Sequence, residues 1–124
     1  MADIYFTKEH EWIAVAGGEA TVGITDYAQQ HLGDLVYVEP PEVGKTIASG
    51  KECAVVESVK AASDVFAPVS GEVVAVNKAA VDQPGLVNES PEEKGWLFKL
   101  KLAKPDELKG LMDRAAYDKF CESL

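Results

Sequence analysis

The stretch from Glu52 to Asn77 constrains the fold of this chain more than any other part of the sequence. Two valine-rich runs lie on either side of a polar segment of small residues, E-S-V-K-A-A-S-D, at positions 57–64. Short β-branched runs joined by a few small or polar residues predict a β-hairpin. Lys60 would then lie at or near the tip of the hairpin, so that one primary amine projects into solvent from a rigid sheet.

The residues around Lys60 distinguish it from an ordinary surface lysine. A lone lysine in a turn is normally a solvated charge with no specific role. Here Glu57 precedes the lysine by three residues, Gly71 follows it by eleven, and the neighbours between them are small. We expect Gly71 to open the next strand, where a turn can require positive φ. An enzyme that modifies one lysine must recognise its position, and a hairpin tip with an acidic flank would allow this.

Length and charge limit the alternatives. The 124 residues suffice for one domain with a hydrophobic core. The net charge of −9, without a run of Lys or Arg, argues against nucleic-acid and anionic-membrane binding. An acidic surface can dock on basic partners or simply keep the protein in solution. Cys53 and Cys121 are distant and form no C-x-x-C motif, so the sequence predicts neither a metal site nor a disulfide framework.

The beginning of the chain carries no recognisable leader. The residues M-A-D-I show neither the basic nor the apolar region of a signal peptide. No run approaches the roughly 18 apolar residues that a membrane span requires. We therefore expect a soluble, monomeric, cytoplasmic protein, and the alternative is a mature organellar protein whose leader has been removed.

Hydrophobic periodicity predicts a chain made mostly of short strands. Besides the hairpin, strands are predicted at 4–6, 11–15, 20–24, 35–38, 46–48, 72–77 and 96–102, the last with Trp96, Phe98, Leu100 and Leu102 on one face. Short extended pieces are predicted around the Pro-Gly pair at 84–85, and one helical turn at 90–95. A helix is predicted over 26–32, capped by Thr25 and ended by Gly33. Two C-terminal helices should begin at Pro105 and after Asp113, the second with an apolar stripe of Ala116, Tyr117, Phe120 and Cys121.

Two similar segments of the sequence indicate how these strands are arranged in a fold. The segments G-D-L-V-Y-V at 33–38 and G-E-V-V-A-V at 71–76 match in residue type at each position, and each precedes a turn and a short piece, 43–48 and 84–88. One such repeat would contribute strands to each of two facing sheets. This predicts a mostly β, pseudo-two-fold sandwich or flattened barrel with short helices. We expect one domain over 1–124, with the sandwich at about 20–102 and the C-terminal helical pair at about 105–122.

The sequence around Lys60 resembles a known modification segment. The run E-S-V-K-A-A-S-D-V-F-A-P-V-S-G-E-V is similar to the lipoylation segment of the glycine cleavage system H protein family. The similarity continues through Y-F-T-K-E-H-E-W at 5–12, G-I-T-D-Y-A at 23–28, H-L-G-D at 31–34, P-G-L-V-N at 84–88, G-W at 95–96 and residues 117–121. Biotin carriers usually flank their lysine with methionines, and lipoyl domains of 2-oxo acid dehydrogenases usually read D-K-A. The V-K-A found here favours the H protein family, whose fold is the lipoyl and biotin carrier sandwich with internal symmetry.

The resemblance implies a carrier that is not itself an enzyme. In that family the lysine at the position of Lys60 carries lipoic acid as an amide, N6-lipoyllysine. Lipoyl-attaching enzymes load it, and Glu57 and Gly71 match the recognition pattern. The P protein, a pyridoxal-phosphate glycine decarboxylase, loads an aminomethyl group onto the arm, the T protein transfers the one-carbon unit onward, and the L protein, a dihydrolipoamide dehydrogenase, reoxidises the arm.

A cleft that protects the loaded, cationic arm is also implied by the resemblance. Glu11 and Asp64 would line it, with Glu9 and His31 nearby, because a cationic amine calls for anions and exclusion of water. Taken singly, each of the acids could equally be a solvated turn charge. His31 could be a helix residue packed against the sheet, and His10, beside Trp12, is expected to be structural.

Two other functions remain open at the level of sequence. A lipoylated module of this kind could relay lipoyl groups to other complexes or serve a 2-oxo acid dehydrogenase. A hydrolase that uses His31 with Asp26 or Asp34 is disfavoured, because no serine or cysteine nucleophile motif accompanies these residues.

Overall fold

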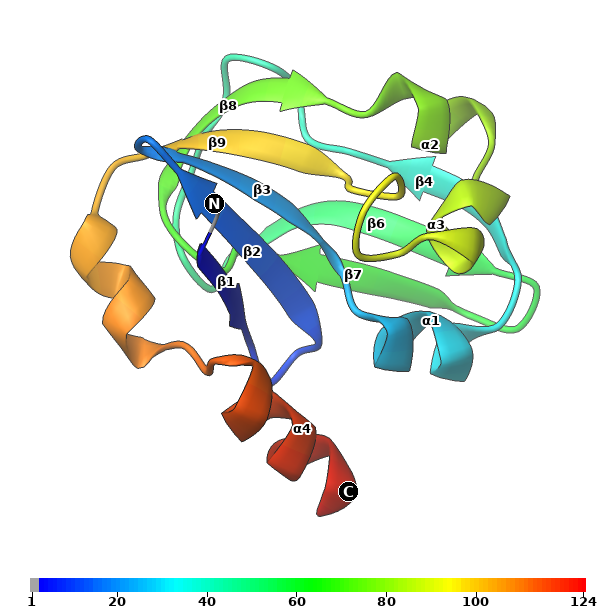
Figure 1. The fold of residues 1–124 in the computed structure, drawn as a ribbon. Coiled ribbons are helices and arrows are strands. Elements are labelled where there is room, and N and C mark those ends of the chain that lie inside the picture. The colour runs from blue at the N-terminus through cyan, green and yellow to red at the C-terminus, as the bar shows by residue number, and fades with distance from the viewer. Residues whose placement is uncertain (1–2) are drawn as a thin grey trace.

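Two facing antiparallel β-sheets with short helices at their ends make up the protein (Figure 1). The computed structural model describes residues 3–124. The larger sheet has the strand order β1-β2-β3-β9-β8-β5 and the smaller one the order β4-β6-β7. The strands are β1 Asp3–Phe6, β2 Glu11–Ala16, β3 Glu19–Ile24, β4 Leu35–Glu39, β5 Thr46–Ile47, β6 Glu52–Ser58, β7 Ala62–Phe66, β8 Gly71–Val76 and β9 Phe98–Leu102. The expected fold class, a mostly β sandwich of two sheets, is confirmed.

The helices follow the capping signals of the sequence where such signals exist. They are α1 Asp26–Leu32, α2 Lys78–Asp82, α3 Gly85–Glu89, a 3-10 helix at Pro105–Gly110, and α4 Arg114–Glu122. Thr25 Oγ1 accepts a bond of 3.2 Å from the backbone N–H of Ala28, and Gly33 ends α1 with φ of 84°. Asp113 caps α4 in the same way through Ala116. None of the helices within residues 3–124 is long and apolar enough to cross a membrane.

The segment after β8 differs from its prediction. Where short extended pieces were expected around Pro84 and Gly85, the chain forms α2 and α3. Pro84 has φ of −54° in the right-handed helical region, so the Pro-Gly pair starts a helix instead of making a β-turn. Each helix buries one residue, Ala80 and Val87, over the end of the sandwich. The helical turn predicted at 90–95 is instead a series of turns.

The two similar segments at 33–38 and 71–76 correspond in the structure of their strands only. The first copy forms β4 in the smaller sheet and the second forms β8 in the larger sheet, so the two copies lie in facing layers as expected. The short piece after β4 forms β5, whereas the piece after β8 is helical. The pseudo-symmetry of the sequence therefore ends at Val76.

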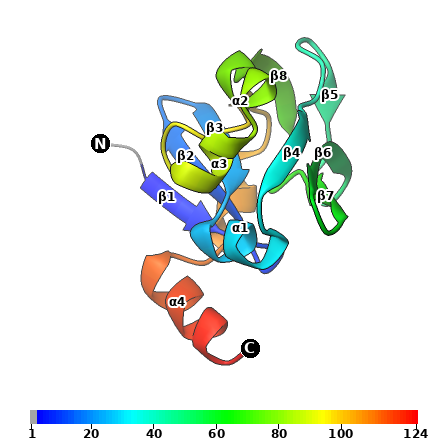
Figure 2. The same ribbon diagram turned by 90° about the vertical axis from the view of Figure 1, so that its right-hand side faces the viewer.

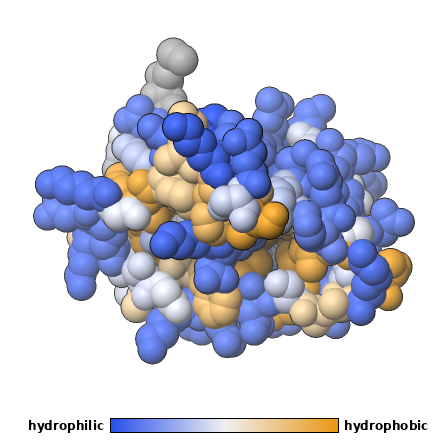
Figure 3. All heavy atoms as spheres, turned by 90° about the horizontal axis from the view of Figure 1, so that it is seen from below, coloured by the Kyte–Doolittle hydropathy of each residue, from blue (hydrophilic) through white to orange (hydrophobic). Residues whose placement is uncertain are grey.

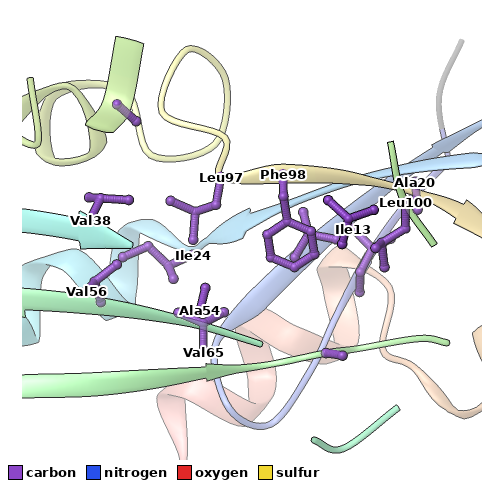
Figure 4. Packing of buried hydrophobic residues seen from close by; sticks show 14 of the residues in the cluster. Ile13, Ala20, Ile24, Val38, Ala54, Val56, Val65, Leu97, Phe98 and Leu100 are labelled. Atoms are coloured by element: carbon purple, nitrogen blue, oxygen red, sulfur yellow. The ribbon is translucent and has the colours of Figure 1, made fainter. Parts of the chain in front are cut away.

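The core lies between the two sheets. Figure 4 shows Ile24 of the larger sheet, with Leu97 beside it, facing Ala54 and Val65 of the smaller sheet. Full burial of a side chain of this kind stabilises the fold by about 1.5–3 kcal/mol. In β9 the buried face is shorter than predicted: the strand begins at Phe98, Leu97 is also buried, and Trp96 is only half-buried.

A separate cluster attaches α4 to the outer side of the larger sheet. Tyr117 is buried against Phe6, with ring centroids 4.7 Å apart. Its hydroxyl is 2.7 Å from both Thr25 Oγ1 and His10 Nδ1. His10 is thus a structural contact between α4 and the turn before β2, as expected. Phe120 and Cys121 are half-buried, whereas Ala116, predicted to belong to the apolar stripe of α4, is exposed.

Candidate functional site at the β6–β7 hairpin

Lys60 lies in a two-residue loop at the tip of the β6–β7 hairpin. Glu57 pairs with Ala62, and the backbone N–H of Ser58 donates a 2.7 Å bond to the carbonyl of Ala61. This is the position that the sequence predicts for the lysine. Figure 2 shows the end of the molecule that carries this loop, next to α1.

The side chain of Ser58 shapes the loop. Its Oγ accepts bonds of 3.1 Å from the backbone N–H groups of both Lys60 and Ala61, and it lies 3.1 Å from the Ala61 carbonyl. Within residues 3–124, His10 is the only non-glycine residue with positive φ. Tight hairpin loops usually require positive φ, which glycine adopts most easily. This loop turns without a positive φ, and the bonds to the Ser58 hydroxyl hold it closed. The E-S pair before V-K-A was a readable signal for such a turn.

The loop rests on the corner between α1 and β4. The backbone N–H of Val59 donates a 3.1 Å bond to the Asp34 carbonyl. Asn88 binds the chain on both sides of this corner. Its Nδ2 donates to the Gly33 carbonyl at 2.9 Å, and its Oδ1 accepts from the Leu35 N–H at 2.8 Å. The amine is therefore presented from a base that is fixed by three separate segments of chain.

Gly33 makes room for the lysine side chain. A Cβ placed on Gly33 would lie 3.1 Å from Lys60 Cε, closer than most real Cβ contacts. The stem of Lys60 thus lies over a residue without a side chain. Lys60 itself is exposed, and no ion pair to its ammonium group exists among residues 3–124. The sequence predicts Gly33 only as the end of α1, and no local pattern indicates its contact with Lys60.

The two residues of the recognition pattern lie in different places. Glu57 is half-buried on the outer face of the smaller sheet, opposite Tyr37 and Ala62, three residues from the lysine. Gly71 is buried at the start of β8, at the opposite end of the sandwich from the hairpin tip (Figure 1). Its φ is not positive, so the expected reason for a glycine is wrong. The actual reason is close approach, because a Cβ there would lie 2.3 Å from the carbonyl oxygen of Lys101.

Glu11 is a buried carboxyl group at the far end of β7. Only 3% of its surface is exposed. Its Oε1 accepts from the Thr7 hydroxyl and its Oε2 from the Phe66 backbone N–H, both at 2.9 Å. Burial raises the pKa of Glu11 to about 7, against the opposing effect of these two hydrogen bonds, and Glu9 adds to the rise. Glu11 therefore joins the larger sheet to β7 and can hold a proton near neutral pH.

The remaining predicted residues, Asp64, Glu9 and His31, do not all belong to this strand. Asp64 is exposed on β7, two residues before Phe66, and so lies on the same strand as the partner of Glu11. Glu9 is exposed in the turn before β2. His31 is exposed on α1, where its ring stacks on Tyr27 at 4.1 Å, and Tyr27 in turn stacks on His10 at 4.4 Å. The structure thus joins Glu11 and Asp64 through β7, whereas His31 belongs to an aromatic stack beside α1.

This arrangement defines a class of protein. A stiff sandwich of two sheets presents the free amine of Lys60 on a hairpin, with Asp64 on the second strand of that hairpin and Glu11 bonded to the end of the same strand. Burial raises the pKa of the half-buried Cys53 thiol to about 12, so it is no nucleophile. This arrangement is typical of carrier domains of the lipoyl and biotin type.

Comparisons with known proteins identify the family. Residues 4–124 match the family model described as "Glycine cleavage H-protein". The chain is 61% identical over its whole length to the glycine cleavage system H protein of Parvibaculum lavamentivorans, covering 99% of that protein. It is 52% identical over 98% of its length to the mitochondrial H protein 2 of Arabidopsis thaliana, covering 78% of it. The crystal structure of an H protein from Mycobacterium marinum matches with a TM-score of 0.88 and 40% identity, over 98% of both chains.

The chain belongs to the glycine cleavage H-protein family. It is a carrier subunit of the glycine cleavage system and not itself catalytic. Its cofactor is lipoic acid, and its partners are the P, T and L proteins of the system. The function predicted from the resemblance is thereby confirmed, and the hydrolase alternative is wrong.

Proposed function

We propose that Lys60 is the residue to which the lipoyl group is attached. The observation that carries this proposal is the exposed ε-amine in a two-residue loop, without an ion pair among residues 3–124, on a base fixed by Asp34 and Asn88. Attachment requires the neutral amine to attack an activated lipoyl acyl carbon. The C–N bond forms, the bond to the leaving group breaks, and two ammonium protons are lost. The resulting amide is uncharged, which removes the one cation of the tip.

The length of the arm fits the strand that leads away from the tip. Lysine and lipoyl chain together extend about 14 Å from the Lys60 Cα, from standard bond lengths. Extended chain from Lys60 to Asp64 spans about 13 Å, and from Lys60 to Phe66 about 20 Å. We propose that the arm lies back along β7, so that its end comes close to Asp64 and faces Glu11, with Glu9 and His31 at the outer margin.

A lipoyl group on Lys60 supplies the disulfide that takes up the aminomethyl unit of glycine and is afterwards reoxidised. The residues of the chain contribute the surroundings. Asp64 offers an exposed carboxylate to a cationic amine. Glu11 offers a shielded one, and it is held in place by Thr7 and Phe66. Tethering at Lys60 keeps the end of the arm at high effective concentration near these groups.

The two recognition residues act by different routes in this proposal. Glu57 is three residues from the amine and half-exposed, so an attaching enzyme can touch it directly. Gly71 lies at the other end of the sandwich. It supports lipoylation indirectly, by allowing β8 to pair closely with β9 at Lys101 and so preserving the larger sheet.

The remaining organisation is also part of the proposal. The chain is one lipoyl-carrier domain over 1–124, with the sandwich at about 20–102 extended at its N-terminus by β1 and β2. We place it in the cytoplasm, supported by high identity to H proteins of bacteria such as Parvibaculum lavamentivorans and Paramagnetospirillum magneticum. Cell fractionation with an antibody to the chain tests this placement.

Mass spectrometry tests the attachment site. Protein from a host supplied with lipoate should be heavier by one lipoyl group, and peptide mapping should place the addition on Lys60. Lipoylated protein should then support glycine–bicarbonate exchange when the P protein is added. A lipoyl group on another lysine would contradict the site. Lipoylation at Lys60 without exchange would favour the alternative in which the protein relays lipoyl groups to other complexes.

A further inference from the structure

A β-bulge in β4 exposes apolar side chains beside Lys60. The register of β4 against β6 shifts between Leu35 and Tyr37. Because of this extra residue, Leu35 and Val38 both face the core, although strict alternation would place them on opposite faces. The two residues between them, Val36 and Tyr37, are left exposed, at 58% and 44% of their surface.

Val59 extends this apolar surface to the tip itself. It is the residue before Lys60 and is 69% exposed, the largest exposure among the large hydrophobic residues of positions 3–124. Its backbone bond to Asp34 places it next to the start of β4. Figure 3 shows apolar surface at the right-hand end of the molecule, where Figure 1 places the hairpin tip. Val36, Tyr37 and Val59, which we call the tip patch, thus adjoin the attachment site.

Acidic residues surround the tip patch. Segments 34–39 and 57–64 contain four acids, Asp34, Glu39, Glu57 and Asp64, and Lys60 as their only cation. Glu39 accepts a 3.0 Å bond from the Tyr37 hydroxyl, and this bond and the charges of Glu39 and Glu57 raise the pKa of Tyr37. A partner that covers the patch must therefore offer an apolar centre with lysine or arginine around it.

The position of the patch selects one partner. An enzyme that acts on the end of a 14 Å arm, about that length by standard bond lengths, can reach it from a distance. The enzyme that forms the amide must approach much more closely, because its acyl donor reacts with the ε-amine itself. Residues adjoining Lys60 must then lie within its footprint. Contiguous apolar groups in that footprint are the kind of contact that provides binding energy in interfaces.

We propose that the tip patch is the docking surface for the lipoyl-attaching enzyme, whose facing surface is apolar at its centre and basic at its rim. The proposal rests on the proposed attachment of lipoate to Lys60. It adds Val36, Tyr37 and Val59 as residues that determine affinity without touching the reacting atoms. Docking through them sets the KM for the carrier, whereas the chemistry at the amine sets kcat.

Steady-state lipoylation tests the proposal. The probe is a purified lipoate–protein ligase with lipoate, ATP and Mg²⁺, with intact mass as the readout. The double variant Val36→Ser, Val59→Ser should raise the KM for the carrier by about tenfold with kcat nearly unchanged, a loss of about 1.4 kcal/mol in binding. Rising ionic strength should lower kcat/KM for the natural chain, because the acidic rim steers association.

Val43→Ser is the matched control. Val43 is 60% exposed but follows the end of β4 that lies away from the tip. Its KM should equal that of the natural chain. Acetylation of Lys60 by a small active ester should proceed at the same rate in all three proteins, which shows that the amine is equally accessible and the tip folded.

The outcomes separate the two proposals. Suppose that the natural chain is lipoylated on Lys60. If the KM of the double variant is then unchanged, or if it is raised only as much as that of Val43→Ser, the docking surface is wrong and the attachment site stands. If the Lys60→Arg chain is still lipoylated, the attachment site is wrong, and the docking proposal falls with it. Rates independent of salt would overturn the basic rim.

Discussion

The two ends of the β7 region are stabilised in opposite ways. At the tip, the contacts are local: Ser58 holds Lys60 and Ala61 from within three residues, and Val59 touches Asp34 across the neighbouring corner. At the far end, the contacts that hold the chain together come from distant parts of the sequence. Glu11 binds Phe66 across 55 residues, Glu107 binds Ser70 across 37, and Gly71 lies against Lys101.

The tip is therefore the place where a chemical group can be added without loss of the fold. A local loop can carry a new group or lose its charge while the sheets remain together. The far end cannot be changed so freely, because Glu11 joins the two sheets to each other and Gly71 allows β8 and β9 to pair closely within the larger sheet.

The substitution Lys60→Arg should abolish lipoylation and all carrier activity, because guanidinium does not give up a proton to act as an acyl acceptor. The free energy of unfolding should change by less than about 0.5 kcal/mol, as is usual for exposed residues. Intact mass and urea unfolding measure the two quantities. A large loss of stability would show that the tip is not independent of the fold.

The substitution Gly71→Val should destabilise the protein by about 3 kcal/mol or more, since its Cβ would lie 2.3 Å from a backbone oxygen that cannot easily move. Lipoylation should fall only in proportion to the unfolded fraction. Gly44→Ala is a useful comparison, because nothing lies within 4 Å of its added Cβ and only backbone strain applies. If the Gly71 variant is fully stable yet poorly lipoylated, the glycine is read directly by the enzyme.

The substitution Glu11→Gln should remove a pH dependence of stability. The pKa of Glu11 is raised from 4.5 to about 7 in the folded chain, so the native state holds a proton that the unfolded state has released. The stability of the natural chain should therefore fall as pH rises from 4.5 to 7, by about 3 kcal/mol from this group. Thermal unfolding of both proteins at pH 4.5 and 8 isolates the effect. Parallel pH profiles would mean that the carboxyl is not shielded.

The substitution Ser58→Ala should lower the free energy of unfolding by about 1 kcal/mol, more than Lys60→Arg, because two backbone N–H groups of the exposed loop lose an acceptor that water can replace. Its effect on lipoylation should be larger than its effect on unfolding, since the loop that orients the amine loses its support. Ser63→Ala on the same hairpin is a control. Equal effects of the two changes on the rate would show that Ser58 has no special role.

Local signals explain what the sequence could predict. Thr25 and Gly33 mark the ends of α1, and the valine runs around E-S-V-K mark the hairpin, because these features depend on neighbouring residues only. The family resemblance supplied the function. The helices α2 and α3 were missed because a Pro-Gly pair fits both a turn and the start of a helix, and only burial of Ala80 and Val87 decides between them.

The site was predictable only in part for the same reason. The position of Lys60 follows from the hairpin, whereas the bulge that exposes Val36 depends on pairing with β6, which no local pattern encodes. The burial of Glu11 depends on Phe66, and the close approach at Gly71 depends on Lys101. Contacts of this kind join residues 20 or more apart, and a single sequence read by local patterns does not contain them.

The free edge of β7 has a consequence for the behaviour of the protein at high concentration. β7 ends the order of the smaller sheet, so a second copy could add a strand there and begin a chain of self-association. Glu11 already occupies the N–H of Phe66, and the charge of Asp64 would lie beside any incoming strand. Glu11 and Asp64 thus also oppose edge-to-edge pairing of neighbouring molecules.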